Sequence, residues 1–223
     1  MMKSIRLLMS IGAMTALIVV IAVKPAVRAD DDSNDPRVAR GFDIAPVTLN
    51  LEGKNHNLVG LGSYLVNAEL DCNVCHNALP GPNGQYLTGG NPYFGQPKRI
   101  NTATYLGGGR DFGPLVPGTT AHIVSRNLTP DMTGRPVGGL SFDQFLHIFR
   151  TGEDLDHLHP TCTTMLQTDC VPSPFDGNLL IIMPWPRFQD MTTHDIRAVY
   201  EYLRAVPCVA GPPAPSPLHN QCF

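Results

Sequence analysis

The segment Cys72-Asn73-Val74-Cys75-His76 constrains this chain more than any other part of its sequence. Two thiols at this spacing can each add to a vinyl group of haem, and the histidine that follows them can ligate the iron from one face. We therefore predict that Cys72 and Cys75 bind one haem c covalently and that His76 is an axial ligand. Because the motif occurs once, the chain must fold around a single large apolar group.

Two other interpretations of the motif are weaker. A zinc site would need two further ligands at comparable spacing, and the remaining cysteines form no second pair of this kind. A redox pair of the thioredoxin type is expected within a βαβ pattern, which this sequence does not show. Haem attachment is the interpretation that the rest of the sequence supports.

The first residues have the pattern of a secretory signal peptide. Lys3 and Arg6 form a charged start, the run from Leu7 to Val23 is almost entirely apolar, and residues 27–29 offer a small-residue cleavage site. We predict a signal peptide at residues 1–29 and export to the periplasm. The alternative is an uncleaved N-terminal anchor, because the apolar run lies near the lower limit of what spans a bilayer. Membrane contact is expected only in that case.

The charge balance argues against nucleic acid as a partner. The whole chain has a formal net charge of −3, and removal of residues 1–29 takes away four basic residues and no acidic ones. Binding to phosphates needs the opposite balance. A redox partner protein, such as a dehydrogenase or an oxidase that presents a basic patch, suits the negative charge better.

The six cysteines fit an oxidising compartment. With the two motif cysteines assigned to haem, four remain, and four cysteines allow three pairings. The local pairings join Cys162 to Cys170 and Cys208 to Cys222. We predict these two disulfide bonds.

Periodicity and capping signals indicate three helices. Apolar residues recur at helical spacing from Leu58 to Ala68, so the first helix leads into the haem motif. The second helix starts at the capping box of Ser141 and Gln144. The third begins near Thr192 and stops at Pro207. These helices predict a mainly α protein.

The remaining sequence is irregular. Residues 30–56 begin with an acidic cluster and show no periodicity, so we interpret them as a linker or arm. Residues 80–135 are rich in Gly, Pro, Asn and Thr, with short strands expected near 100–104 and 122–125. Residues 208–223 form a Pro-rich C-terminal tail. The predicted fold class is therefore mainly α, with long irregular loops around one haem.

The second axial ligand decides the chemistry of the iron. A thioether favours ferrous iron and raises the reduction potential, as an electron carrier requires. We predict Met183, because it ends the apolar segment that starts at Leu179 and precedes prolines that hold the chain extended. The alternative role for Met183 is packing in the core. The competing methionines and histidines are Met132, Met165, Met191, His157 and His159.

Other residues are candidates for contacts with the haem. Trp185 is the only tryptophan, and we predict that it packs against the haem or covers its edge. Arg99, Arg110 and Arg126 are candidates to pair with the haem propionates, with solvent exposure as the alternative. Residues 127–131 are expected to order a loop through Asx-type turns.

Together these motifs resemble bacterial class I cytochromes c, in particular the cytochrome subunits of periplasmic alcohol and aldehyde dehydrogenases. The resemblance rests on Ser63 to Val66, Cys72 to His76, Ser125 to Asp131, Phe142 to Gly152, Met183 to Pro186 and Met191 to Leu203. It implies a cytochrome c domain at residues 57–207, in which the first and last helices cross near the haem. It also implies His76 and Met183 as the axial ligands. Those dehydrogenase subunits usually carry several haems, whereas this chain has one motif.

These features predict a protein that carries one electron at a time and is not an enzyme. Six-coordinate iron leaves no open position for a substrate. One alternative is a haem protein with an open distal site and peroxidase-like or ligand-sensing chemistry. Another is a haem subunit that stays docked to a dehydrogenase, which requires the same haem chemistry.

Overall fold

The computed structural model describes residues 34–77, 82–116, 121–164, 167–211, 213–214, 216 and 219–222. The predicted signal peptide and Met165 lie outside the described residues. The description below concerns the compact unit Asp32–Phe223. Within the described part of the chain, no helix has the length and apolar character needed to cross a membrane.

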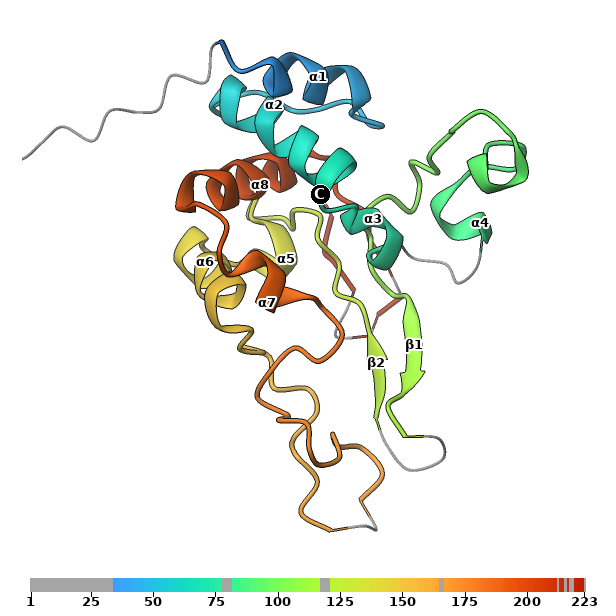
Figure 1. The fold of residues 1–223 in the computed structure, drawn as a ribbon, viewed down its shortest axis with the longest axis vertical. Helices are drawn as coiled ribbons and strands as arrows, with labels where there is room; N and C mark the ends of the chain where they lie inside the picture. Colours follow the sequence, from blue (N-terminus) through green and yellow to red (C-terminus); the bar gives the residue numbers. More distant parts are fainter. Residues whose placement is uncertain are drawn as a thin grey trace, which may run out of the picture. The chain divides into compact units, whose positions relative to one another are not determined.

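Helices make up most of the regular structure, accompanied by one two-stranded sheet (Figure 1). The elements in chain order are α1 (Pro36–Ile44), α2 (His56–Tyr64), a π-helix (Leu65–Glu69), α3 (Cys72–Cys75), α4 (Pro82–Gln85), a 3-10 helix (Pro92–Phe94), β1 (Asp111–Pro114), β2 (His122–Val124), α5 (Pro136–Gly139), α6 (Phe142–Thr151), α7 (Trp185–Phe188) and α8 (Thr193–Ala205). This composition confirms the prediction of a mainly α protein.

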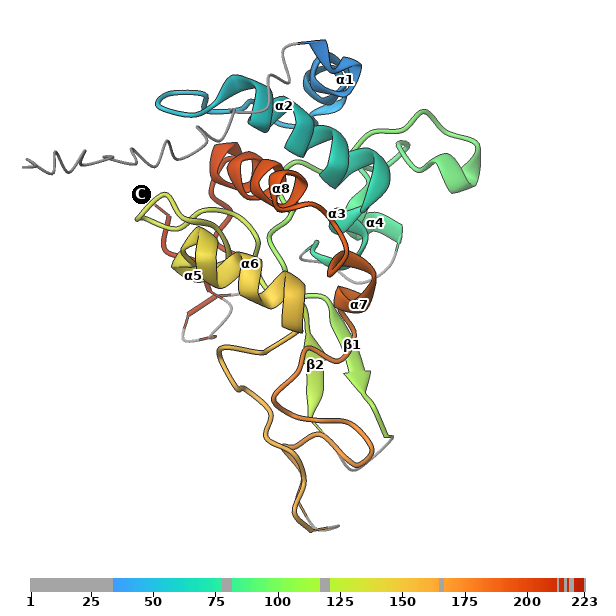
Figure 2. The same cartoon turned by 60° about the vertical axis from the view of Figure 1, so that its left-hand side comes forward.

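The core is organised around the contact between α2 and α8, with α1 on the other side of α2 (Figures 1 and 2). Ile196, Val199 and Leu203 of α8 are almost completely buried there. The two helices approach closely at Gly62, where an added Cβ would overlap the carbonyl oxygen of Ala198. A glycine is therefore required at this point of α2.

A buried polar network lies beside this helix contact. The Tyr105 hydroxyl donates to Oδ1 of Asn67 at 2.5 Å and lies 2.8 Å from the Tyr202 hydroxyl. Asn67 belongs to the π-helix that continues α2, and its Nδ2 donates to Tyr202 at 3.1 Å. Burial raises the pKa of both tyrosines, so both hydroxyls stay protonated. The network satisfies polar groups that burial would otherwise make costly.

The structure differs from the sequence-based prediction of a linker over residues 30–56. Helix α1 occupies the middle of this range and packs against α2. Asp35 caps its N-terminus by accepting a hydrogen bond from the Arg37 backbone N–H at 2.9 Å, and Pro36 occupies the first helical turn. An aspartate before a proline is a common start of a helix. The neighbouring aspartates obscured this signal, because they gave the segment the appearance of an acidic linker.

The second and third predicted helices, α6 and α8, are confirmed together with their capping signals. In α6, the Ser141 hydroxyl accepts from the Gln144 backbone N–H at 3.3 Å, and the Gln144 side chain accepts from the Ser141 N–H at 2.9 Å. The helix ends at Gly152, whose φ of 73° is in the left-handed region. Helix α8 starts after Thr192, whose side chain accepts from the backbone N–H of Asp195 at 3.0 Å.

Of the two strands in the sheet, only β2 was predicted from the sequence. β2 at His122–Val124 is confirmed, but its antiparallel partner is β1 at Asp111–Pro114. The expected strand at residues 100–104 is wrong: Ile100 forms only an isolated bridge with Tyr86, and a turn follows it. The glycines at 107–109 lie between Ile100 and β1, so the chain turns there before it can pair with β2.

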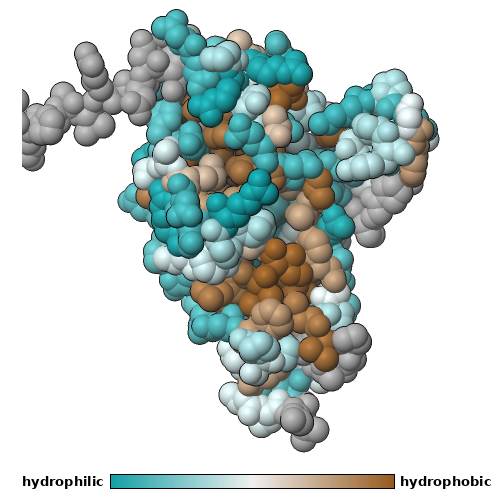
Figure 3. Space-filling model, in the orientation of Figure 1, coloured by the Kyte–Doolittle hydropathy of each residue, from teal (hydrophilic) through white to brown (hydrophobic). Residues whose placement is uncertain are grey.

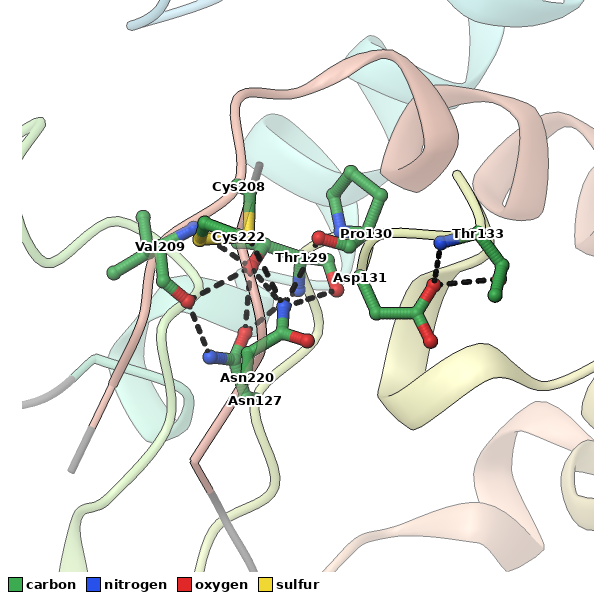
Figure 4. The surroundings of a disulfide bond; sticks show 9 residues. All are labelled: Asn127, Thr129, Pro130, Asp131, Thr133, Cys208, Val209, Asn220 and Cys222. Carbon is green, nitrogen blue, oxygen red and sulfur yellow. Dashed lines mark hydrogen bonds between the residues drawn. A yellow bond between two sulfur atoms is a disulfide. The ribbon is translucent and has the colours of Figure 1, made fainter. Parts of the chain in front are cut away.

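Both predicted disulfide bonds are confirmed, Cys162–Cys170 and Cys208–Cys222. The second one fixes the C-terminal tail beside the loop that follows β2 (Figure 4). Asn220 of the tail is 5% exposed and donates to the Thr129 hydroxyl at 3.2 Å and to the Pro130 carbonyl at 3.0 Å. The tail is thus tied to the domain by polar contacts as well as by the covalent bond.

Candidate functional site

A cavity that opens to solvent lies between α3, α6, α7, α8 and the segment at 179–184. Most of the side chains that line it are apolar, as is usual for a site that holds a ligand or cofactor. Figure 3 shows hydrophobic residues gathered in the lower part of this face, between α7 and the strands. The apolar side chains that line the cavity include Leu70, Ile123, Leu128, Phe145, Phe149, Ile182 and Leu203.

The segment from Cys72 to His76 lies at the wall of this cavity. Helix α3 is a single turn that begins after Asp71, whose backbone has the left-handed φ of 46°. This turn follows the π-helix directly and presents Cys72, Cys75 and His76 to the same space. A rare backbone conformation next to a π-helix costs free energy and is found preferentially at functional sites.

Cys72 and Cys75 are free thiols, in contrast to the four cysteines in disulfide bonds. Desolvation by the surrounding protein raises the pKa of Cys72 to about 12. The Cys72 thiol is therefore protonated at neutral pH while the cavity holds no ligand.

His76 has a fixed orientation and tautomer. Its Nδ1 lies 2.8 Å from the carbonyl oxygen of Arg126. A carbonyl oxygen only accepts hydrogen bonds, so Nδ1 carries the proton and Nε2 keeps a free lone pair. Desolvation lowers the pKa of His76, which keeps the ring neutral. A neutral imidazole held through Nδ1–H by a carbonyl oxygen is the usual arrangement of a metal-ligating histidine.

Met183 lines the cavity that His76 lines. It is partly buried and packs against the hydrophobic core. The segment before it is held to the end of α6 by a hydrogen bond from the Leu180 N–H to the Gly152 carbonyl at 2.7 Å. The segment after it turns at once into α7, because the Trp185 N–H donates to the Met183 carbonyl at 2.8 Å. Both sides of Met183 are thus fixed by backbone contacts.

The structure separates Met183 from most of its rivals. Met132 is 55% exposed, and neither it nor Met191 lines the cavity. His157 is exposed in a turn, also away from the cavity lining. His159 does line the cavity, and its Nδ1 lies 3.3 Å from a carboxylate oxygen of Asp169. Among the described candidates for a second ligand, Met183 and His159 therefore share the space with His76.

The predicted arginine candidates occupy different positions. Arg126 lines the cavity, but its guanidinium already pairs with Asp154 at 2.7 Å and with Asp156 at 3.0 Å. Arg110 lies behind α3, where it donates to the Val74 carbonyl at 2.5 Å. Arg99 is exposed and is not among the lining residues. The pair of aspartates was missed, because a partner far along the sequence leaves no local signal.

The predicted contact of Trp185 with the cofactor has no counterpart among the residues that line the cavity. The Trp185 ring instead packs against Gly152, where an added Cβ would overlap it. Its Nε1–H donates to the Leu180 carbonyl at 3.1 Å. Trp185 thereby holds the extended segment before Met183 against the end of α6. The tryptophan acts on the site through the backbone that carries Met183.

The loop predicted at residues 127–131 forms the expected turn. Oδ1 of Asn127 accepts from the Thr129 N–H at 2.9 Å and from the Thr129 hydroxyl at 2.7 Å. Leu128 between them faces the cavity. The polar side of this loop contacts the C-terminal tail (Figure 4), so one loop connects the cavity wall to the tail.

Comparisons with models of protein families, with curated proteins and with solved structures found no match to this chain. Within the described ranges, no group of three or more His, Cys, Asp or Glu side chains is arranged to hold a metal ion. The chemistry of the site therefore has to be argued from its own residues. It joins two free thiols, a neutral imidazole and a thioether in one apolar cavity.

Proposed function

We propose that this protein is an exported c-type cytochrome that carries one electron at a time between redox partner proteins of the periplasm. The observation that carries the proposal is the orientation of His76. Its Nδ1–H is engaged by the Arg126 carbonyl, which leaves Nε2 free at the wall of a large apolar cavity. A histidine of the core would normally engage both ring nitrogens with protein groups.

The residues around the cavity suit a haem. Cys72 and Cys75 would hold it covalently, and His76 and Met183 would ligate its iron, in a fold of the cytochrome c type. When bound, haem supplies an iron centre that exchanges one electron. The apolar lining would exclude water and lower the local polarity, and a thioether ligand from Met183 would favour the ferrous state.

The roles of the other residues follow from their contacts. Arg126 positions His76 through its backbone carbonyl, and its side chain is held by Asp154 and Asp156. Trp185 fixes the segment that carries Met183. No step of substrate chemistry is assigned to them, because an electron carrier needs a rigid site more than a reactive one.

The proposal is tested first by the attachment of the cofactor. The chain is produced in a host with a cytochrome c maturation system, and its mass is measured before and after acid–organic extraction. We expect a mass increase of one haem that survives extraction. Replacing Cys72 and Cys75 by alanine should make the haem extractable, whereas replacing Cys162 and Cys170 should leave it attached.

Two results would contradict this proposal. One is extractable haem in the unaltered protein. The other is bound zinc in place of iron, which would return the motif to the zinc interpretation.

A further inference from the structure

A second concave surface lies on the opposite side of α3 from the cavity described above. It is formed by α3 and by the arm, which we define as residues 82–100. In Figures 1 and 2 the segment with α4 extends away from the other helices next to α3. We call this surface the arm groove. The residues lining it include Val74, Asn77, Tyr86, Tyr93, Phe94 and Arg110.

The arm exposes aromatic side chains to an unusual degree. Tyr93 is 85% exposed and Phe94 is 62% exposed, and they lie in a 3-10 helix whose start is capped by Asn91. The cap fixes the backbone, so these rings are displayed on an ordered turn. Rigid exposed aromatic residues are enriched at protein interfaces, because they bury a large area at low entropic cost.

The charge of this region is opposite to that of the chain as a whole. No acidic residue occurs from Cys72 to Arg110, whereas Lys98, Arg99 and Arg110 are basic. Asp71 precedes α3 and offsets part of the charge of Lys98. Asp111 is paired with His122 at 2.7 Å. The arm and α3 therefore present net positive charge on an otherwise acidic chain.

The floor of the groove carries an unused acceptor. Asn77 is 3% exposed, and its Nδ2 donates to the backbone carbonyls of Asn73 and Val74 at 2.8 Å and 3.0 Å. Among the residues that the structure describes, its Oδ1 has no hydrogen-bond partner. A buried polar atom without a partner costs free energy, and an incoming N–H group would remove that cost.

We propose that the arm groove is the docking surface for an acidic segment of the redox partner protein. This inference rests on the proposed function, because α3 carries the haem-binding cysteines and Val74 belongs to both α3 and the groove. Carboxylates of the partner would lie near Arg99 and Arg110. Apolar side chains of the partner would pack on Tyr93 and Phe94. The positive charge of the arm groove implies an acidic patch on the partner. The negative net charge of the whole chain, taken alone, led us to expect a basic patch there.

The test is a titration of the haem-loaded ferrous protein with a short oligoglutamate peptide that has one central leucine, followed by NMR. We expect shifts confined to the arm groove, including the side-chain amide of Asn77. Replacing Arg99 and Arg110 by glutamine should weaken binding about tenfold at low salt, and added salt should reduce the difference. Replacing Tyr93 and Phe94 by serine should weaken it about tenfold at any salt concentration.

The controls separate the groove from general electrostatics. Arg40→Gln on α1 and Arg187→Gln on α7 remove exposed positive charges elsewhere and should leave the affinity unchanged. Because Arg110 also contacts α3, Arg99→Gln alone serves as a second variant with an exposed side chain. In the loaded protein, the Arg99 and Arg110 variant should also be reduced about threefold more slowly by hexacyanoferrate(II) at low salt.

The inference is overturned if the peptide causes no shifts, if its shifts lie outside the groove, or if an oligolysine peptide binds more tightly at the same residues. Failure of the proposed function would look different. It would appear as absence of covalent haem in the purified protein, before any peptide is added.

Discussion

Thr129 shows how much one hydroxyl contributes to this protein. The residue is completely buried. Its hydroxyl donates to Asn127 at 2.7 Å and accepts from the Val209 N–H at 3.0 Å. Thr129→Val preserves the shape but leaves these partners unsatisfied, so we expect the free energy of unfolding to fall by about 1–3 kcal/mol. Urea unfolding of the haem-loaded protein measures it.

A control for this prediction lies in the same loop. Thr133 is exposed, and its hydroxyl donates to Asp131 at 2.6 Å. Water can replace that contact, so Thr133→Val should change the free energy of unfolding by no more than about 0.5 kcal/mol. Equal losses in the two variants would show that the tail is not anchored through Thr129.

At the scale of elements, the contact between α2 and α8 sets the stability of the fold. Gly62→Ala would place a methyl group on the Ala198 carbonyl oxygen, and the helices would have to separate. We expect a loss of at least about 3 kcal/mol in the free energy of unfolding, measured by urea or thermal unfolding.

The matched control is Gly53→Ala, where φ is 65° but no atom lies within 4 Å of the added Cβ. That variant pays only for backbone strain, about 1 kcal/mol. If Gly62→Ala were as stable as Gly53→Ala, the close approach of α2 and α8 would not be a determinant of the fold.

The same scale shows what sequence can and cannot predict. Helices α6 and α8 were predicted because their signals are local: a capping box at Ser141 and an apolar stripe that ends before Pro207. Helix α1 was missed because the acidic cluster before it hid the capping role of Asp35, and because its packing on α2 leaves no local signal. The strand expected at 100–104 is a turn, and β1 was missed because strand formation there depends on how the chain turns through its glycines.

The candidate site follows the same rule. Cys72, Cys75 and His76 lie within five adjacent residues, so the sequence alone predicts that their side chains share one site. The contacts of Arg126 with Asp154 and Asp156 join segments that are far apart in sequence and carry no local pattern. Trp185 was expected at the cofactor because it is the only tryptophan, whereas its contacts with Gly152 and Leu180 depend on the folded chain.

At the scale of the whole molecule, the long irregular segments have a common role. The loop after β2 and described parts of the chain from Glu153 to Met183 line one cavity, and α3 forms part of its wall. Each segment is fixed by its own device: the Asn127 turn, the Cys162–Cys170 disulfide or the Trp185 contact. Irregular segments of this length are uncommon in compact domains unless they have a function, such as packing against a large ligand.

The electronic spectrum of the ferric protein tests the central claim most directly. We predict low-spin iron and a weak charge-transfer band in the far red that reports the bond between iron and the Met183 sulfur. The band should vanish in Met183→His, with a lower reduction potential, because imidazole stabilises ferric iron relative to thioether. It should survive in Met132→Leu. A high-spin ferric spectrum with rapid binding of peroxide would contradict the account and indicate an enzyme with an open distal site.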